Sequence, residues 1–182
     1  MVRVEDLNIT FFHLPKNAGS SIANWLTMYA DGEEYMDDFR HEIPQALAPL
    51  FDDFGWSFCC VRNTWDRYVS WYNFFRGRGK IHACFDDWMS AVMSGNHSAK
   101  YIRPMTGQLS TADNVDYIIR YENLEEDFKV IQQKTNCDKP LFKSNSSKRT
   151  AYTDYYSSQS QIDWVAERHA DEIARFNYTY GG

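Results

Sequence analysis

A short loop near the N-terminus combines the residue types that bind an anion. It follows an apolar run over 9–14 and precedes a segment, 22–30, that can form a helix. The residues that could do chemistry there are Lys16, Gly19, Ser20 and Ser21. A helix N-terminus leaves backbone N–H groups unpaired and carries partial positive charge. The lysine adds a full charge, the hydroxyls add donors, and the glycine lets the backbone approach a ligand. The pattern predicts a phosphate-binding loop, with an ordinary strand–turn–helix corner as the alternative.

A second strand-to-helix corner carries another cation and another hydroxyl. Residues 56–61 form an apolar run typical of a buried strand, and Arg62 stands at its C-terminal end, where open α/β sheets bind ligands. A helix is expected over 64–76, and its apolar stripe consists of Trp65, Tyr68, Val69 and Tyr72. Ser70 lies off that stripe. Two such corners suit a ligand with two separated anionic groups.

These corners resemble the signature segments of the sulfotransferases that use 3′-phosphoadenosine-5′-phosphosulfate (PAPS). Residues 15–21, Pro-Lys-Asn-Ala-Gly-Ser-Ser, are similar to the family's 5′-phosphosulfate loop, PKTAGTS, and residues 61–70 to its 3′-phosphate segment, VRNPWDRLVS. Asn17 and Ser20 stand where the family has Thr, and Thr64 stands where it has Pro. Ser20 keeps a hydroxyl, and Thr64 loses only a pre-set φ at a helix start. The likeness is closest to carbohydrate-type sulfotransferases and their small bacterial and viral-like relatives, and it spans nearly the whole chain.

The resemblance implies a set of site residues. The PAPS-binding residues would be Pro15, Lys16, Asn17, Ala18, Gly19, Ser20, Ser21, Arg62, Ser70, Lys148 and Arg149. In the family, a histidine between the two segments faces the acceptor hydroxyl, so His41 is the expected general base; histidine titrates near neutral pH, as a base must. The alternative for His41 is an exposed loop histidine. Lys148 and Arg149 could instead belong to a solvated basic loop, and Arg62 could pair with Asp66 or Glu122.

The remaining histidines and the cysteines are expected to be structural. His13 lies at a strand end beside the loop, and His169 lies on an apolar helix face. The four cysteines show neither disulfide nor metal spacing, so they are interpreted as reduced thiols: Cys59, Cys60, Cys84 and Cys137. No cluster has the spacing of a metal site, and sulfuryl transfer from PAPS requires no metal.

Composition narrows the class of protein. The 182 residues suffice for one compact α/β domain over 1–182, and 16 % are aromatic. The net charge of −6 argues against a nucleic-acid partner, because phosphate backbones attract basic surfaces. No apolar run approaches the length of a signal peptide or a membrane span, so we expect a cytoplasmic protein without a membrane partner.

Hydrophobic periodicity predicts alternating strands and helices. The strands are expected over 8–13, 56–61 and 115–121, and the helices over 20–30, 42–53, 64–76, 85–94, 123–135 and 159–175. This alternation is typical of parallel β-α-β units. With the resemblance, it predicts an α/β fold: a three-layer, P-loop nucleotide-kinase-like core with a central parallel sheet flanked by helices. The long connections, at 31–41, 77–84, 95–114 and 136–158, would form lids and substrate walls.

The function that these observations predict is a transferase reaction. The sulfuryl group of PAPS would move to a hydroxyl of a carbohydrate or another small acceptor by in-line displacement. His41 would take the acceptor proton, and Lys16 with the loop N–H groups would stabilise the developing charge. One alternative is a nucleotide-kinase-like phosphotransferase, although Lys16 precedes Gly19 and the loop therefore lacks the Gly-Lys-Ser/Thr ending of a Walker A motif. Another is a catalytically silent module that binds a nucleotide or glycan.

Overall fold

Two compact units make up the chain. The computed structural model describes all residues except 36–41, 43, 50, 52, 96–107 and 143–148. Met1–Arg62 and Gly107–Ser146 form the first unit, here called the sheet unit. Asn63–Thr106 and Ser147–Gly182 form the second, called the helical unit. Each unit is therefore assembled from two stretches that are separate in the sequence.

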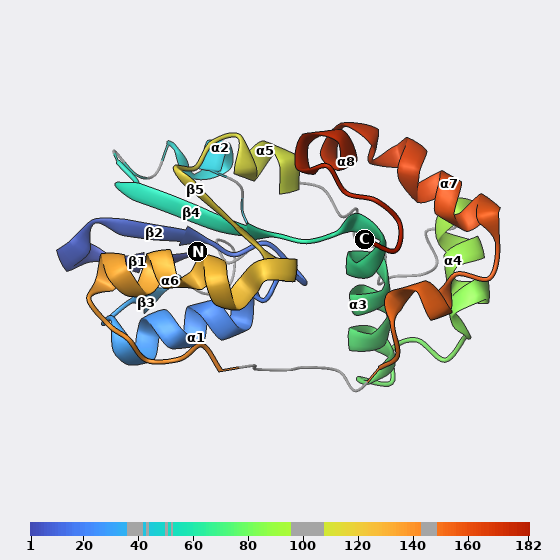
Figure 1. Ribbon diagram of the computed structural model, residues 1–182, viewed down its shortest axis with the longest axis horizontal. Helices are drawn as coiled ribbons and strands as arrows, with labels where there is room; N and C mark the ends of the chain where they lie inside the picture. Colours follow the sequence, from blue (N-terminus) through green and yellow to red (C-terminus); the bar gives the residue numbers. More distant parts are fainter. Residues whose placement is uncertain (36–41, 43, 50, 52, 96–107, 143–148) are drawn as a thin grey trace. The chain divides into compact units, whose positions relative to one another are not determined.

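The sheet unit is built on a five-stranded sheet with the strand order β3-β1-β2-β4-β5 (Figure 1). The strands are β1 (Val2–Val4), β2 (Ile9–Phe12), β3 (Glu33–Glu34), β4 (Trp56–Val61) and β5 (Tyr117–Arg120). β2, β4 and β5 run parallel to one another, whereas β1 pairs antiparallel with both β2 and β3. The three expected strands are confirmed and run parallel to one another, but the sheet as a whole is mixed, because β1 and β3 add antiparallel pairs at one edge.

A tight connection produces the antiparallel edge. β1 and β2 are joined by the 3-10 turn η1 (Glu5–Leu7) and by Asn8, which has a left-handed φ of 49°. Asparagine tolerates this conformation better than most residues. So short a link permits only antiparallel pairing, because a parallel pair needs a crossover of a dozen or more residues. The sequence did not predict β1, since only Val2 and Val4 carry its buried pattern.

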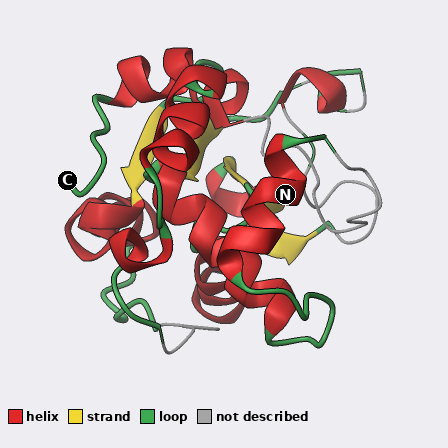
Figure 2. Ribbon diagram, turned by 90° about the vertical axis from the view of Figure 1, so that its right-hand side faces the viewer, coloured by secondary structure: helices red, strands yellow, loops and turns green. Residues whose placement is uncertain are grey.

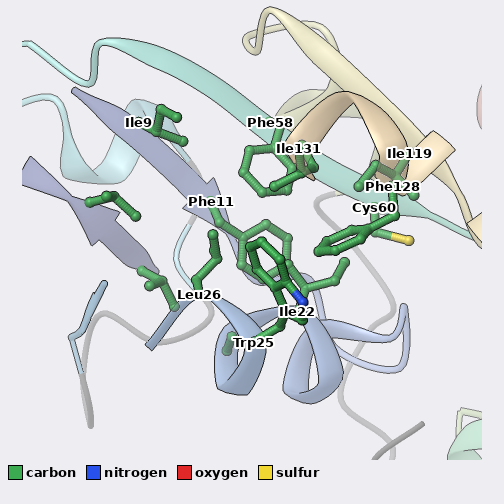
Figure 3. Close-up of a cluster of buried hydrophobic side chains, with 13 residues drawn as sticks. Ile9, Phe11, Ile22, Trp25, Leu26, Phe58, Cys60, Ile119, Phe128 and Ile131 are labelled. Carbon is green, nitrogen blue, oxygen red and sulfur yellow. The ribbon is translucent and has the colours of Figure 1, made fainter. Parts of the chain in front are cut away.

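Helices cover both faces of this sheet (Figure 1). α1 (Gly19–Tyr29) and α6 (Leu124–Thr135) lie on one face, and α2 (Pro44–Leu47) and α5 (Gln108–Ala112) lie on the other. The core under α1 and α6 is a cluster of buried side chains from alternate strand positions and from the inner helix faces (Figure 3). Trp25 of α1 meets Phe128 of α6 edge-on at 5.0 Å between ring centroids. This core fixes α1, and with it the loop that precedes α1.

The helical unit contains helices and loops, with no strand among its described residues (Figure 2). Its helices are α3 (Thr64–Arg76), α4 (Phe85–Met93), η4 (Tyr152–Tyr155), α7 (Gln159–Arg168) and α8 (Ala170–Phe176). The predicted apolar stripe of α3 is confirmed, because all four of its residues are buried. Tyr72 packs on Phe85 and Trp88 of α4 at 5.3 and 5.4 Å between ring centroids, which forms an aromatic core.

Three helical elements differ from the sequence expectation. The helix expected over 42–53 is a single turn, Pro44–Leu47. Helix α5 lies inside a segment that was expected to be a loop, because its five residues are too few for a periodic pattern. The helix expected over 159–175 is two helices that meet at His169, with no glycine or proline to signal the break.

Candidate functional site

The loop between β2 and α1 and the residue after β4 lie at one edge of the sheet. β2 and β4 are parallel neighbours, with Phe12 opposite Cys59 in the register. Their C-terminal ends therefore face the same edge, where α/β sheets bind ligands. The β2–α1 loop, 13–18, leaves from one strand, and Arg62 leaves from the other. The loop of the first predicted segment and Arg62 of the second are thus brought together within the sheet unit.

The loop holds a strained backbone. Lys16 has φ 69° and Ala18 has φ 57°, both in the left-handed region that side chains with a Cβ seldom adopt. Each such residue costs on the order of 1–3 kcal/mol and persists only where its surroundings over-determine it. Asn17, between them, is completely buried. Its Nδ2 donates to the carbonyl of Cys60 at 2.8 Å and to Oε1 of Gln108 at 2.6 Å. Both amide hydrogens are therefore used in hydrogen bonds within the protein.

The N-terminus of α1 has no capping side chain. Its N-cap residue is Ala18, and no acidic residue occurs in its first turn. Alanine at this position costs about 0.5–2 kcal/mol relative to the usual Ser, Thr, Asp or Asn. The N–H of Ser21 turns back to the carbonyl of Ala18 at 2.9 Å. This helix start, with Lys16 before it and Ser20 and Ser21 in its first turn, has the composition of an anion site.

Gly19 is required by a side chain of the protein. A Cβ at this position would lie 1.8 Å from Cδ2 and 2.0 Å from Nε2 of His13. The imidazole therefore occupies the space beside the Gly19 Cα, so a glycine is needed here for packing within the protein. His13 is 5 % exposed and stacks on Phe11 at 5.9 Å between ring centroids. His13, directly after β2, thus packs against the first turn of α1 and sets the distance between that turn and the strand.

Arg62 contacts the β2–α1 loop directly. Its Nη1 donates to the carbonyl of Lys16 at 2.9 Å, and its guanidinium carbon lies 3.7 Å from the ring centroid of Tyr121. The side chain is 4 % exposed. A stacked guanidinium keeps a fixed plane, which suits two-point recognition of a phosphate. Asp66, one of the two partners considered for Arg62, pairs with Arg149.

Gln108 belongs to this site and was not found from the sequence. It is the first residue of α5 and is completely buried. Its Oε1 accepts from the N–H of Arg62 and its Nε2 donates to the carbonyl of Arg62, both at 3.0 Å. No motif marks it, because a buried glutamine in a short helix has no periodic or spacing signature.

The start of α3, in the helical unit, is organised differently. Asn63 caps the helix, with its Oδ1 accepting from the N–H groups of Trp65 and Asp66. Arg149 pairs with Asp66 through Nη2, while its Nη1 is buried and has no hydrogen-bond acceptor among the described residues. Ser70 is half-buried and stands one turn beyond Asp66, on the same side of the helix. A buried guanidinium nitrogen without an acceptor is costly, and an anion would satisfy it.

Two of the expected site residues, His41 and Lys148, lie outside the described residues. Their roles therefore stay predictions. Glu122, the residue named as a possible partner for Arg62, is exposed in η3 (Tyr121–Asn123).

Two titratable groups of the helical unit lie away from these segments. The hydroxyl of Tyr68 and Nε2 of His169 are 2.9 Å apart. Burial, reinforced by the charges of Arg67 and Arg168, lowers the pKa of His169 from 6.5 to about 4. Burial raises the pKa of Tyr68. His169 is therefore neutral near pH 7, which agrees with a structural role.

The cysteines are free thiols, as expected. Cys59 and Cys60 are buried in β4, Cys84 is exposed and Cys137 is partly buried. Burial raises the pKa of Cys59 to about 12. In the described ranges, no three His, Cys, Asp or Glu side chains gather as a metal site would require. Nor does any helix in those ranges have the length and apolar character needed to cross a membrane.

Comparison with known protein families matches the chain to a family model. Residues 1–179 match the model described as the sulfotransferase family. No curated protein and no solved structure matches the chain. The family match covers nearly the whole sequence, including both segments described above and Gln108, and it supports sulfuryl transfer in general terms.

Proposed function

Because the chain belongs to the sulfotransferase family, we propose that it transfers the sulfuryl group of PAPS to a hydroxyl of a carbohydrate or another small acceptor. The observation that carries this proposal is the uncapped start of α1, flanked by Lys16 and by the hydroxyls of Ser20 and Ser21. A helix start without a cap or an acid is suited to an anion from outside the chain. The 5′-phosphosulfate of PAPS is such an anion.

A second set of residues, three cations and one serine, is assigned to the 3′-phosphate. Arg62, stacked on Tyr121, offers a planar guanidinium next to the loop. Ser70 and Arg149 carry the same assignment from the resemblance, and Arg149 brings a buried Nη1 that has no acceptor among the described residues. Lys148 completes the set. This phosphate distinguishes PAPS from ATP and AMP, so these residues would set the choice of nucleotide.

The proposed reaction is an in-line displacement at sulfur. The acceptor oxygen forms a bond to sulfur while the bond from sulfur to the bridging oxygen of the 5′-phosphate breaks. The electron pair of that bond leaves with adenosine 3′,5′-bisphosphate, and His41 takes the acceptor proton. Lys16 and the first N–H groups of α1 stabilise the charge that develops on the leaving phosphate. Holding both reactants in line supplies much of the remaining acceleration.

The direct test is transfer of labelled sulfate. The protein is incubated with PAPS carrying radioactive sulfur and with a panel of saccharides, without added magnesium, and in parallel with labelled ATP and magnesium. We expect label on a saccharide together with adenosine 3′,5′-bisphosphate, and no phosphoryl transfer from ATP. Phosphorylation from ATP would favour a kinase-like enzyme. Binding of the bisphosphate without transfer to any acceptor would favour a silent binding module.

A further inference from the structure

We propose that Gln108 is a positioning residue that locks the β2–α1 loop to the end of β4, and that Asn17 is the other half of this lock. The inference rests on the proposed function, because what the lock positions is the PAPS-binding loop relative to Arg62. Gln108 is completely buried, so it acts through its neighbours and not by contact with a ligand.

Gln108 extends the pairing of β4 by one residue. Its side-chain amide accepts from the N–H and donates to the carbonyl of Arg62, both at 3.0 Å. These are the two bonds that a neighbouring strand would make to that residue. The backbone of Arg62 is therefore held as if it were still in the sheet, although β4 ends at Val61.

Asn17 joins the loop to the same amide. Its Nδ2 has two hydrogens, and it uses them on Oε1 of Gln108 and on the carbonyl of Cys60. Oε1 of Gln108 thus accepts from Asn17 and from the backbone of Arg62 at once. The loop and the strand end share one acceptor, so neither can shift without breaking a buried hydrogen bond.

The guanidinium of Arg62 adds a further contact between the end of β4 and the loop. Its Nη1 donates back to the carbonyl of Lys16, the residue before Asn17. The chain of contacts runs from Lys16 to Arg62, on to Gln108, and back to Asn17. These contacts anchor the loop segment in which Lys16 and Ala18 have left-handed backbone conformations. Strained backbone conformations persist only where several surrounding contacts fix them, and these hydrogen bonds are such contacts.

A lock of this kind makes a specific kinetic prediction. Displacing a reacting group by about 1 Å can lower the rate about 10²-fold. Gln108→Leu removes both bonds to Arg62 and the acceptor of Asn17, so kcat/KM for PAPS should fall by about 10²-fold. The KM for the acceptor should stay within about twofold of the wild type. Gln132→Leu is the matched control, because Gln132 lies on α6 and its Nε2 makes one exposed bond, to the carbonyl of Lys139.

A second pair of variants keeps the test valid if Gln108→Leu does not fold. Asn17→Ala removes the donor, whereas Asn17→Thr restores one hydroxyl donor. We expect Asn17→Ala to weaken binding of adenosine 3′,5′-bisphosphate and Asn17→Thr to recover much of that loss. A purely structural role would lower the melting temperature of both variants without this recovery of affinity.

Amide hydrogen exchange of residues 16–20 separates the lock from the proposed function. We expect faster exchange of these amides in Gln108→Leu or Asn17→Ala than in the wild type and in Gln132→Leu. If the wild type neither binds the bisphosphate nor transfers sulfate, the proposed function fails, yet faster exchange would still support the lock. The lock proposal is overturned if Gln108→Leu and Asn17→Ala fold and their amides exchange as slowly as those of the wild type. If the protein turns over PAPS, the same outcome also requires kcat/KM values within about twofold of the wild type.

Discussion

Arg62 and Lys16 are joined by a hydrogen bond in which the guanidinium of the first donates to the backbone carbonyl of the second at 2.9 Å. The residue assigned to the 3′-phosphate therefore also supports the loop assigned to the 5′-phosphosulfate. A substitution at Arg62 should affect both ends of the nucleotide. The ammonium of Lys16 is not part of this bond, so the two cations can be tested separately.

Removing the Lys16 ammonium should slow turnover without unfolding the protein. Losing one preorganised charge contact typically costs about 10²–10³ in rate. We expect a loss of that size in kcat/KM for PAPS in Lys16→Ala, with a melting temperature close to the wild type. The control is Lys129→Ala, which removes an exposed lysine of α6 that pairs with Glu126. Wild-type turnover in folded Lys16→Ala would contradict the assignment.

Nucleotide preference tests Arg62. A hydrogen bond to a charged group contributes about 1.5–3 kcal/mol, and two of them correspond to at least about a hundredfold in affinity. Calorimetric titration of the wild type should show that preference for adenosine 3′,5′-bisphosphate over AMP. Arg62→Ala should lose most of it, and Arg62→Lys should recover little, because an ammonium cannot reproduce a stacked planar fork. Equal affinity of the wild type for both nucleotides would exclude a 3′-phosphate site.

The pH dependence of turnover tests His41. A histidine base is inactive when protonated, so kcat should fall as the pH drops through roughly 6 to 7. His41→Ala should lose turnover and still bind adenosine 3′,5′-bisphosphate. The control is His82→Ala, which removes an exposed histidine. If His41→Ala keeps the rate and pH profile of the wild type, another group is the base, and Glu122 is the next to be replaced.

Gly19→Ala should destabilise the protein through one identified clash. The new methyl would lie 1.8 Å from Cδ2 of the His13 ring. Overpacking of this kind typically costs about 1–3 kcal/mol in the free energy of unfolding, measured by urea denaturation. Adding His13→Ala should relieve the cost, so the double variant should be more stable than the sum of the single changes predicts. Additive effects would show that the ring is not the obstacle.

Stability at acidic pH should depend on His169. Its pKa is about 4 in the folded protein, against 6.5 ordinarily. Between these values the unfolded chain binds a proton that the folded protein does not, so the free energy of unfolding falls as the pH is lowered through that range. His169→Phe should flatten this dependence between about pH 6.5 and 4. Equal slopes in the wild type and the variant would refute the pKa shift.

The sequence was informative for the elements with a clear apolar run, a helical stripe or a motif. The stripe of α3 and the apolar runs of β2 and β4 predicted these elements, and the order of lysine, glycine and serines predicted the loop at the start of α1. Short elements were missed, because β1 and α5 contain too few residues for a period to emerge. Gln108 was missed for a related reason. Its role depends on backbone groups of Arg62, which is 46 residues away, and no local pattern encodes such a contact.

The division of the chain into two interleaved units also sets an order of synthesis. Translation completes the sheet unit at residue 146, while residues 147–182 of the helical unit have yet to be made. The β2–α1 loop, Arg62 and Gln108 therefore all exist before α7 and α8 do. The β2–α1 loop can therefore be synthesised before the segments that complete the unit of α3 and α4. The residues that complete the helical unit are thus synthesised after the whole sheet unit, and a chain truncated before residue 147 would lack α7 and α8.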